Sequence, residues 1–268
     1  MKPLDYFAAH PVFRLEDFTK AHQTENRVKP SSSLAIVKQH VRAGNLLRIR
    51  RGIYAAVPHG RTFESVTPDP YVVATNLAPD AVVAYHGALQ FFGKAHSLSR
   101  RVQFLTATRV KPMGFRGTEF VPVQVPRSLR GLPDVGGGVV EKVRDGAGVR
   151  VATLERTLVD VLDRPRHGGG WEEIWRSLES VEFFDLDAVI DYAFKLASAV
   201  TVAKVGFYLE QHREALMVED HHLQRLGERS PRQPMYLERG RRESGRLLSR
   251  WNLVVPERLL SRSWEEVV

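Results

Sequence analysis

The hydrophobic and polar positions from residue 31 to residue 57 predict a short helix followed by a two-stranded basic ribbon. Leu34, Val37 and Val41 recur at i, i+3 and i+7, which gives the helix one apolar face. Three serines precede this face, and any of them can supply an N-cap oxygen. Gly44 is expected to end the helix, because glycine readily adopts the left-handed backbone of a C-terminal cap.

The opposite face of this helix is small and polar. It carries Ser32, Ala35, Gln39 and Arg42, with Lys38 at its edge. A helix of this kind, followed by a cationic hairpin, is typical of a winged helix-turn-helix that meets DNA. The predicted DNA-binding residues are Ser31, Ser32, Lys38, Gln39, Arg42, Arg48, Arg50 and Arg51.

These residues are expected to contact DNA in two ways. Arginine pairs with guanine and glutamine with adenine in the major groove, so the helix residues are candidates for base edges or phosphates. The hairpin arginines suit backbone phosphates or the minor groove, because a wing approaches from the side. The alternative for any one of these residues is that it lies on the solvent-exposed surface of the module and does not contact DNA.

The remaining pattern predicts an α+β protein with an N-terminal winged helix-turn-helix domain over residues 1–60. Short helices over 4–10 and 15–21 complete this module, and residues 59–69 are polar and predict a linker. Residues 61–268 are expected to form a mixed α/β domain, with strands in 66–152 and a helical bundle in 153–268. Further helices are expected over 70–77, 85–92, 154–162, 171–180, 186–197, 200–210 and 213–226, and strands over 102–106, 118–125, 139–144, 149–152 and 252–256.

Composition narrows the class of protein. The chain has 268 residues, a 43% hydrophobic fraction and no cysteine, so disulfides and thiolate metal sites are excluded. The N-terminus lacks the apolar core of a signal peptide, and no stretch approaches the roughly 18 apolar residues of a membrane span. We expect a cytoplasmic protein without a membrane partner.

Positive charge is concentrated in two blocks of the chain, whose formal net charge is +8. Residues 1–60 hold ten Lys/Arg against four Asp/Glu, and residues 222–250 hold eight against three. A localised positive patch is typical of a protein with a polyanionic partner. The second block predicts an additional basic or antitoxin surface at Arg239, Arg241 and Arg242.

Catalytic and metal chemistry find little support in the sequence. The glycine triplets at 136–138 and 168–170 lack the Gly-Lys-Ser/Thr ending of a phosphate-binding loop. His221 and His222 are adjacent, and neighbouring helix residues are not expected to point at one ion. Glu155, Arg156, Thr157 and Asp160 either form a structural ion pair or mark a site for toxin contact, and we favour the ion pair. We therefore expect no catalytic residues, metal or cofactor, and no enzymatic activity.

Four segments follow one another in a distinctive order along the chain. They are AGNLLRIRRGIYA at 43–55, PDPYVVATNLAPDAVVAYHGALQFFG at 68–93, VRVATLERTLVDVLDRP at 149–165 with the glycine-rich turn after it, and AKVGFYLE at 203–210. In this order the chain resembles the AbiEi-type antitoxins of bacterial type IV toxin–antitoxin systems.

The resemblance implies a winged-helix domain followed by a C-terminal α/β antitoxin domain. It implies autorepression through inverted repeats in the promoter DNA, by a monomer or weak dimer. It also implies neutralisation of a nucleotidyltransferase toxin encoded nearby, without a stable complex being required. Two alternatives stay open: a plain winged-helix regulator without antitoxin activity, and an enzyme that modifies a partner toxin.

Overall fold

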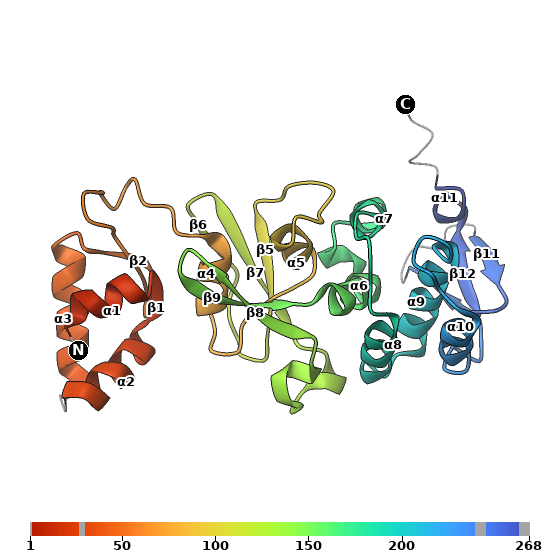
Figure 1. The fold of residues 1–268 in the computed structure, drawn as a ribbon, viewed down its shortest axis with the longest axis horizontal. Helices are drawn as coiled ribbons and strands as arrows, with labels where there is room; N and C mark the ends of the chain where they lie inside the picture. Colours follow the sequence, from red (N-terminus) through yellow and green to blue (C-terminus); the bar gives the residue numbers. More distant parts are fainter. Residues whose placement is uncertain (1, 27–29, 239–244, 263–268) are drawn as a thin grey trace. The chain divides into compact units, whose positions relative to one another are not determined.

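The computed structural model describes residues 2–26, 30–238 and 245–262 and shows an α+β fold (Figure 1). The chain forms two compact units. The first comprises the described residues up to Val83, together with Arg100–Gln124 and Val140–Val151. The second comprises Ala84–Ser99, Val125–Val139 and the described residues from Ala152 onward. The predicted boundary at residue 60 falls within the first unit and stays a prediction.

Helices and strands are interspersed up to Ala152, and helices dominate afterwards. The helices are α1 Pro3–Ala9, α2 Leu15–Asn26, α3 Pro30–Arg42, α4 Pro70–Asn76, α5 His86–Phe91, α6 Leu154–Asp163, α7 Trp171–Glu179, α8 Leu186–Lys195, α9 Ala199–Gln211, α10 Asp220–Gly227 and α11 Glu257–Leu260. The strands are β1 Val12–Arg14, β2 Leu46–Arg50, β3 Ile53–Ala56, β4 Val82–Val83, β5 Arg101–Thr106, β6 Met113–Phe115, β7 Thr118–Gln124, β8 Val139–Arg144, β9 Ala147–Ala152, β10 Met235–Tyr236, β11 Gly245–Leu248 and β12 Leu253–Pro256. Short 3₁₀ turns occupy Arg127–Leu129, Pro133–Gly136 and Pro165–His167.

The first 56 residues build three helices around a three-stranded sheet of order β1-β3-β2. Both pairings are antiparallel, and β1, which the pattern did not predict, aligns Phe13 with Tyr54. The core between helices and sheet is aromatic: Tyr6, Phe7, Phe13, Phe18, Val37, Leu46 and Tyr54 are buried together. The rings of Phe7 and Phe13 stack with their centroids 5.2 Å apart. This packing fixes α3 and the β2–β3 hairpin on one small scaffold.

The prediction for α3 was partly wrong. The helix begins at Pro30, so the serines lie in its first turn and do not cap it. Leu34 is 37% exposed, whereas Val37 is fully buried and Val41 is half-buried. Ser33 turns inward instead and lies 3.0 Å from His22 Nδ1 of α2. The inner face of α3 therefore includes Ser33 and Val37 but not Leu34.

The predicted helix end at Gly44 is confirmed. Gly44 has a φ of 78°, and its N–H donates to Val41 O. The next N–H, that of Asn45, reaches back to His40 O at 2.9 Å. Together these bonds form a Schellman cap, which satisfies the last carbonyls of α3 and turns the chain directly into β2.

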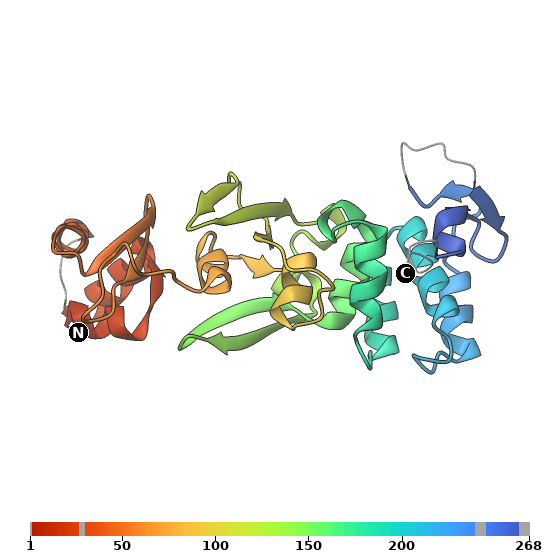
Figure 2. The same ribbon diagram turned by 90° about the horizontal axis from the view of Figure 1, so that it is seen from above.

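A six-stranded mixed sheet of order β6-β7-β5-β4-β9-β8 lies within the first unit, apart from its boundary residues. In Figure 2 the β6–β7 and β8–β9 hairpins lie on either side of the short β4. Asp145 and Gly146 link β8 to β9 with positive φ at both positions, as the hairpin prediction required. The strands β4 and β6 were not predicted.

The second unit is mainly helical, as predicted, and ends in a sheet of order β10-β12-β11. Residues 213–219 are not helical, so the helix predicted over 213–226 is shorter and begins at Asp220 behind a Glu219 capping box. Among the described residues, no helix is long and apolar enough to cross a membrane.

Candidate functional site

The outer face of α3 presents the side chains that the sequence singled out. Lys38, Gln39 and Arg42 are exposed, Ala35 lies between them, and Ser32 is half-buried. Ser31 belongs to the first turn of α3, but its side chain lies outside the described structure. Leu34, one turn before Lys38, is exposed and adds an apolar side chain to this face. The sequence pattern had assigned Leu34 to the core.

The hairpin that carries the predicted arginines contains an irregularity in β2. The register with β3 shifts between Arg48 and Arg50, as in a β-bulge. A regular strand would place Arg48 on the same face as the buried Leu46. The pairing is regular up to Arg48, so the shift changes the strand only beyond it, where Ile49 is buried and Arg50 is half-buried. Arg48 and Arg51 are exposed.

The side chains of this predicted interface are not neutralised by the part of the chain that the structure describes. No ion pair or side-chain hydrogen bond joins Lys38, Gln39, Arg42 or the three hairpin arginines to another described residue. Their charge therefore faces solvent, where it can attract an anionic partner. Arg239, Arg241 and Arg242, the predicted second basic surface, lie outside the described residues.

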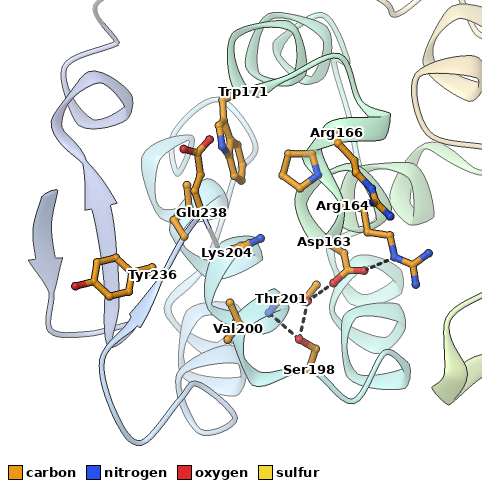
Figure 3. A pocket seen from close by; sticks show the side chains of 12 residues that line it. Asp163, Arg164, Arg166, Trp171, Ser198, Val200, Thr201, Lys204, Tyr236 and Glu238 are labelled. Carbon is orange, nitrogen blue, oxygen red and sulfur yellow. Dashed lines mark hydrogen bonds and ion pairs between the residues drawn. The ribbon is translucent and has the colours of Figure 1, made fainter. Parts of the chain in front are cut away.

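A second candidate site is a pocket of about 650 Å³ in the second unit (Figure 3). It lies between the end of α6, the start of α7, the first turns of α9 and strand β10. The lining residues are Asp163, Arg164, Pro165, Arg166, Trp171, Ser198, Val200, Thr201, Lys204, Tyr236, Leu237 and Glu238. No local sequence pattern marks this pocket, because its lining joins three separate stretches of the chain, 163–171, 198–204 and 236–238.

Each carboxylate in the pocket already accepts from neighbouring groups. Asp163 accepts from Thr201 Oγ1 at 2.6 Å and pairs with Arg164 Nε at 3.3 Å. Glu238 accepts from Arg258 Nη2 at 2.7 Å. Both carboxylates of the lining are therefore compensated, Asp163 by Arg164 and Glu238 by Arg258.

Two polar groups in the pocket are almost fully buried. Lys204 is 7% exposed, and its Nζ donates to Leu162 O at 3.0 Å and lies 5.5 Å from the Trp171 ring centroid. Trp171 is 5% exposed, and its Nε1 has no hydrogen-bond partner in the described structure. Figure 3 shows Lys204 pointing from α9 toward the segment that carries Asp163 and Arg164.

The electrostatics beside the pocket disfavour additional positive charge. Burial lowers the pKa of His167 to about 4, and the nearby Arg166 and Arg164 add to this effect. His167 Nε2 lies 3.1 Å from Arg166 Nε, so the neutral ring can accept from the guanidinium. The histidine thus orients Arg166 without adding to its charge at neutral pH.

The expectation that His221 and His222 cannot point at one ion was wrong on geometry. One ligand atom each from His221, His222 and Asp187 lies within 4.8 Å of the others. However, Arg225 already pairs with Asp187. His222 Nδ1 accepts the Glu219 N–H at 3.1 Å, which places the proton of the neutral ring on Nε2. The cluster therefore has the spacing of a metal site, although Arg225 and the Glu219 N–H already bind Asp187 and His222.

The polar group at the start of α6 forms a buried ion pair, as favoured. Arg156 Nε lies 3.2 Å from Asp160 Oδ2, and both side chains are essentially inaccessible. Tyr192 OH donates to the same carboxylate at 2.9 Å, and Arg156 Nη1 donates to Gly137 O at 2.8 Å. The pair links α6 to α8 and to the glycine-rich 136–138 turn, and not to the sheet as expected.

No family model matches the chain, and no curated protein matches it either. Among solved structures, the crystal structure of the RV2827C protein from Mycobacterium tuberculosis is similar, with a TM-score of 0.56 at 16% sequence identity. The match covers 98% of this chain and 93% of that chain. At this identity the similarity concerns the fold alone.

Proposed function

We propose that the N-terminal part of this chain is a winged helix-turn-helix that binds specific duplex DNA, with α3 in the major groove. The observation that carries this proposal is the unpaired polar face of α3 beside the exposed arginines of the β2–β3 hairpin. The order of three helices and an antiparallel sheet supports it, because a recognition helix followed by a wing needs this sequence of elements.

The residues of the interface divide by role. Gln39 and Arg42 lie on the exposed face of α3, and their side chains offer bidentate pairing with adenine and guanine. Leu34 suits apolar contact with a thymine methyl group. Arg48 and Arg51 on the hairpin are suited to phosphates, which position the protein without reading sequence.

The rigid seating of α3 supports this assignment. Base readout requires side chains held within a fraction of an ångström, which a mobile helix does not provide. The Ser33–His22 contact joins α3 to α2, the Schellman cap joins it to β2, and Val37 anchors its centre in the aromatic core. The interface is therefore built on packed elements.

We further propose that this chain is an AbiEi-type antitoxin that represses its own operon and neutralises a nucleotidyltransferase toxin. The support is the order of the four segments that resemble the family. These segments lie largely on packed elements such as β3, α4, α6 and α9. They therefore support a core shared with the family, and they do not identify the surface that would act on the toxin.

DNA recognition is tested on the full chain by fluorescence anisotropy, with its own promoter and a scrambled duplex of equal length. Gln39→Ala and Arg42→Ala are expected to lose affinity for the promoter but little for scrambled DNA, because a base-edge pair is worth about 1–3 kcal/mol. Arg109→Ala, an exposed arginine in the first unit, is the matched control. Equal losses on both duplexes would reduce α3 to a phosphate contact.

The antitoxin function is tested by co-expression with the neighbouring nucleotidyltransferase. The wild type and a variant lacking the hairpin arginines are both expected to rescue growth, whereas only the wild type represses the promoter. In the alternative of a plain regulator, neither protein rescues growth. Rescue that is lost with a pocket variant, while folding and repression persist, would favour chemistry or ligand sensing in the second unit.

A further inference from the structure

A smaller pocket lies in the first unit, beside the segment that the sequence predicted to be a linker. Residues of the stretch 58–69 contribute to its lining, together with residues of β1, β3, α4 and the turn between β8 and β9. Its volume of about 400 Å³ falls within the range of small-molecule sites, about 300–1,000 Å³. None of the lining residues belongs to α3 or β2, so this linker pocket is separate from the predicted DNA interface.

Much of the wall of the linker pocket is apolar. Pro11, Ala56 and Pro68 are half-buried and Pro58 is exposed, so each of these side chains leaves part of its surface accessible. None of them carries a hydrogen-bonding group. Covering such a surface with an aliphatic group removes apolar area of both partners from water, which favours binding. The lining therefore suits a ligand with an aliphatic body.

Two side chains of opposite charge line the same pocket without partners. Arg61 and Asp145 are exposed, and neither forms an ion pair or a side-chain hydrogen bond with another described residue. The third charged residue of the lining, Asp69, is already satisfied. Its Oδ1 accepts two backbone N–H groups of α4, and its Oδ2 lies 3.1 Å from Arg144 Nε. The lining therefore offers one free cation and one free anion.

We propose that the linker pocket binds a free α-amino acid with an aliphatic side chain. The aliphatic group packs against the apolar wall, Arg61 binds the carboxylate, and Asp145 binds the ammonium group. The exposed hydroxyl of Thr67, which makes no hydrogen bond within the described chain, is a further donor for the carboxylate. A purely anionic ligand would leave Asp145 unpaired, and a purely cationic ligand would leave Arg61 unpaired. Only a zwitterion pairs with both.

Isothermal titration calorimetry of the full chain tests this proposal with leucine, glycine, 4-methylpentanoate and isoamylamine as probes. The last two keep the leucine side chain but lack the ammonium group and the carboxylate, respectively. We expect saturable binding of leucine at millimolar concentrations. Glycine is expected to bind roughly tenfold more weakly, because it buries no aliphatic side chain. Each single-charge probe is expected to bind about fivefold more weakly than leucine, because one exposed charge pair is lost.

Two variants assign the charges of the ligand to their partners. Arg61→Gln is expected to weaken leucine and 4-methylpentanoate about fivefold and to leave isoamylamine unchanged, because the amine has no carboxylate. Asp145→Asn is expected to weaken leucine and isoamylamine by about the same factor and not to weaken 4-methylpentanoate. Asp145 has a φ of 46°, a left-handed conformation that asparagine also adopts, so this replacement keeps the turn.

Arg109→Gln and Asp5→Asn are the matched controls, because both residues are exposed, belong to the first unit and do not line the linker pocket. Circular dichroism spectra establish that each variant is folded. The proposal is overturned if leucine shows no saturable binding, if a single-charge probe binds as tightly as leucine, or if Arg61→Gln and Arg109→Gln weaken leucine binding equally. These measurements contain no DNA, so their outcome is independent of the proposed DNA recognition.

Discussion

Breaking the buried Arg156–Asp160 pair is expected to destabilise the second unit strongly. Asp160→Asn keeps the shape of the side chain and leaves an oxygen for the Tyr192 hydroxyl. It removes the negative charge opposite Arg156, whose side chain is inaccessible to solvent. Removing one partner of a buried ion pair costs about 3–5 kcal/mol. Gly137 O and the Tyr192 ring, 5.0 Å from the guanidinium, still stabilise the cation, so we expect about 3 kcal/mol.

The matched control is Glu172→Gln. Arg176 and Glu172 also form a pair four residues apart on one helix, at 3.1 Å, but both side chains are partly exposed. Such pairs contribute about 0.3–0.5 kcal/mol. The two variants therefore differ mainly in burial, and the free energy of unfolding is expected to separate them by about 2–3 kcal/mol.

Urea unfolding followed by tryptophan fluorescence measures this difference. The four tryptophans of the chain all follow residue 170, so their emission reports on the C-terminal part. Replacing both partners, as Arg156→Met with Asp160→Leu, is expected to cost less than Asp160→Asn alone, because no buried charge remains unpaired. The reasoning is refuted if Asp160→Asn costs less than about 1 kcal/mol, or no more than Glu172→Gln.

Two further predictions concern packing and pH. Gly206→Ala is expected to destabilise the chain by about 1–3 kcal/mol in urea unfolding, because the added Cβ would clash with the buried Trp251 ring. Gly227→Ala is the control and should be neutral, because a Cβ at Gly227 would have no neighbour within 4 Å. Equal effects of the two substitutions would contradict this account. The lowered pKa of His167, about 4, means that the unfolded chain takes up its proton first as pH falls. The stability contributed by His167 is therefore present above pH 6.5 and lost between about pH 6.5 and 4. His167→Gln should flatten the slope of the unfolding free energy against pH in that window. If the slope is unchanged, the pH dependence comes from other groups.

The sequence predicted the elements whose pattern is regular. The helix ending at Gly44, the Asp145–Gly146 hairpin and the amphipathic helices predicted over 154–162, 171–180, 186–197 and 200–210 were placed correctly, because capping, turn chemistry and periodicity are local signals. The two-residue strands β4 and β10 were missed, since they are too short to show a period and exist only through their neighbours.

Tertiary contacts explain the remaining differences. Nothing near Ser33 in the sequence indicates that it turns inward toward His22 while Leu34 is exposed. The bulge between Arg48 and Arg50 depends on pairing with β3. The second-unit pocket joins Trp171, Lys204 and other residues far apart in the chain, so no local motif marks it.

The salt dependence of DNA binding tests the central proposal most directly. Each phosphate contact contributes about 0.9 to the slope of log K against log salt concentration, because it releases a condensed counterion. If Arg48, Arg50 and Arg51 each contact one phosphate, their replacement by alanine in the full chain should reduce this slope by about 3 and weaken promoter and scrambled DNA alike. Replacing the exposed Arg109 and Lys111 by alanine should leave the slope near that of the wild type. The account is contradicted if the wild type binds no duplex at low salt, or if the hairpin variant keeps the wild-type slope.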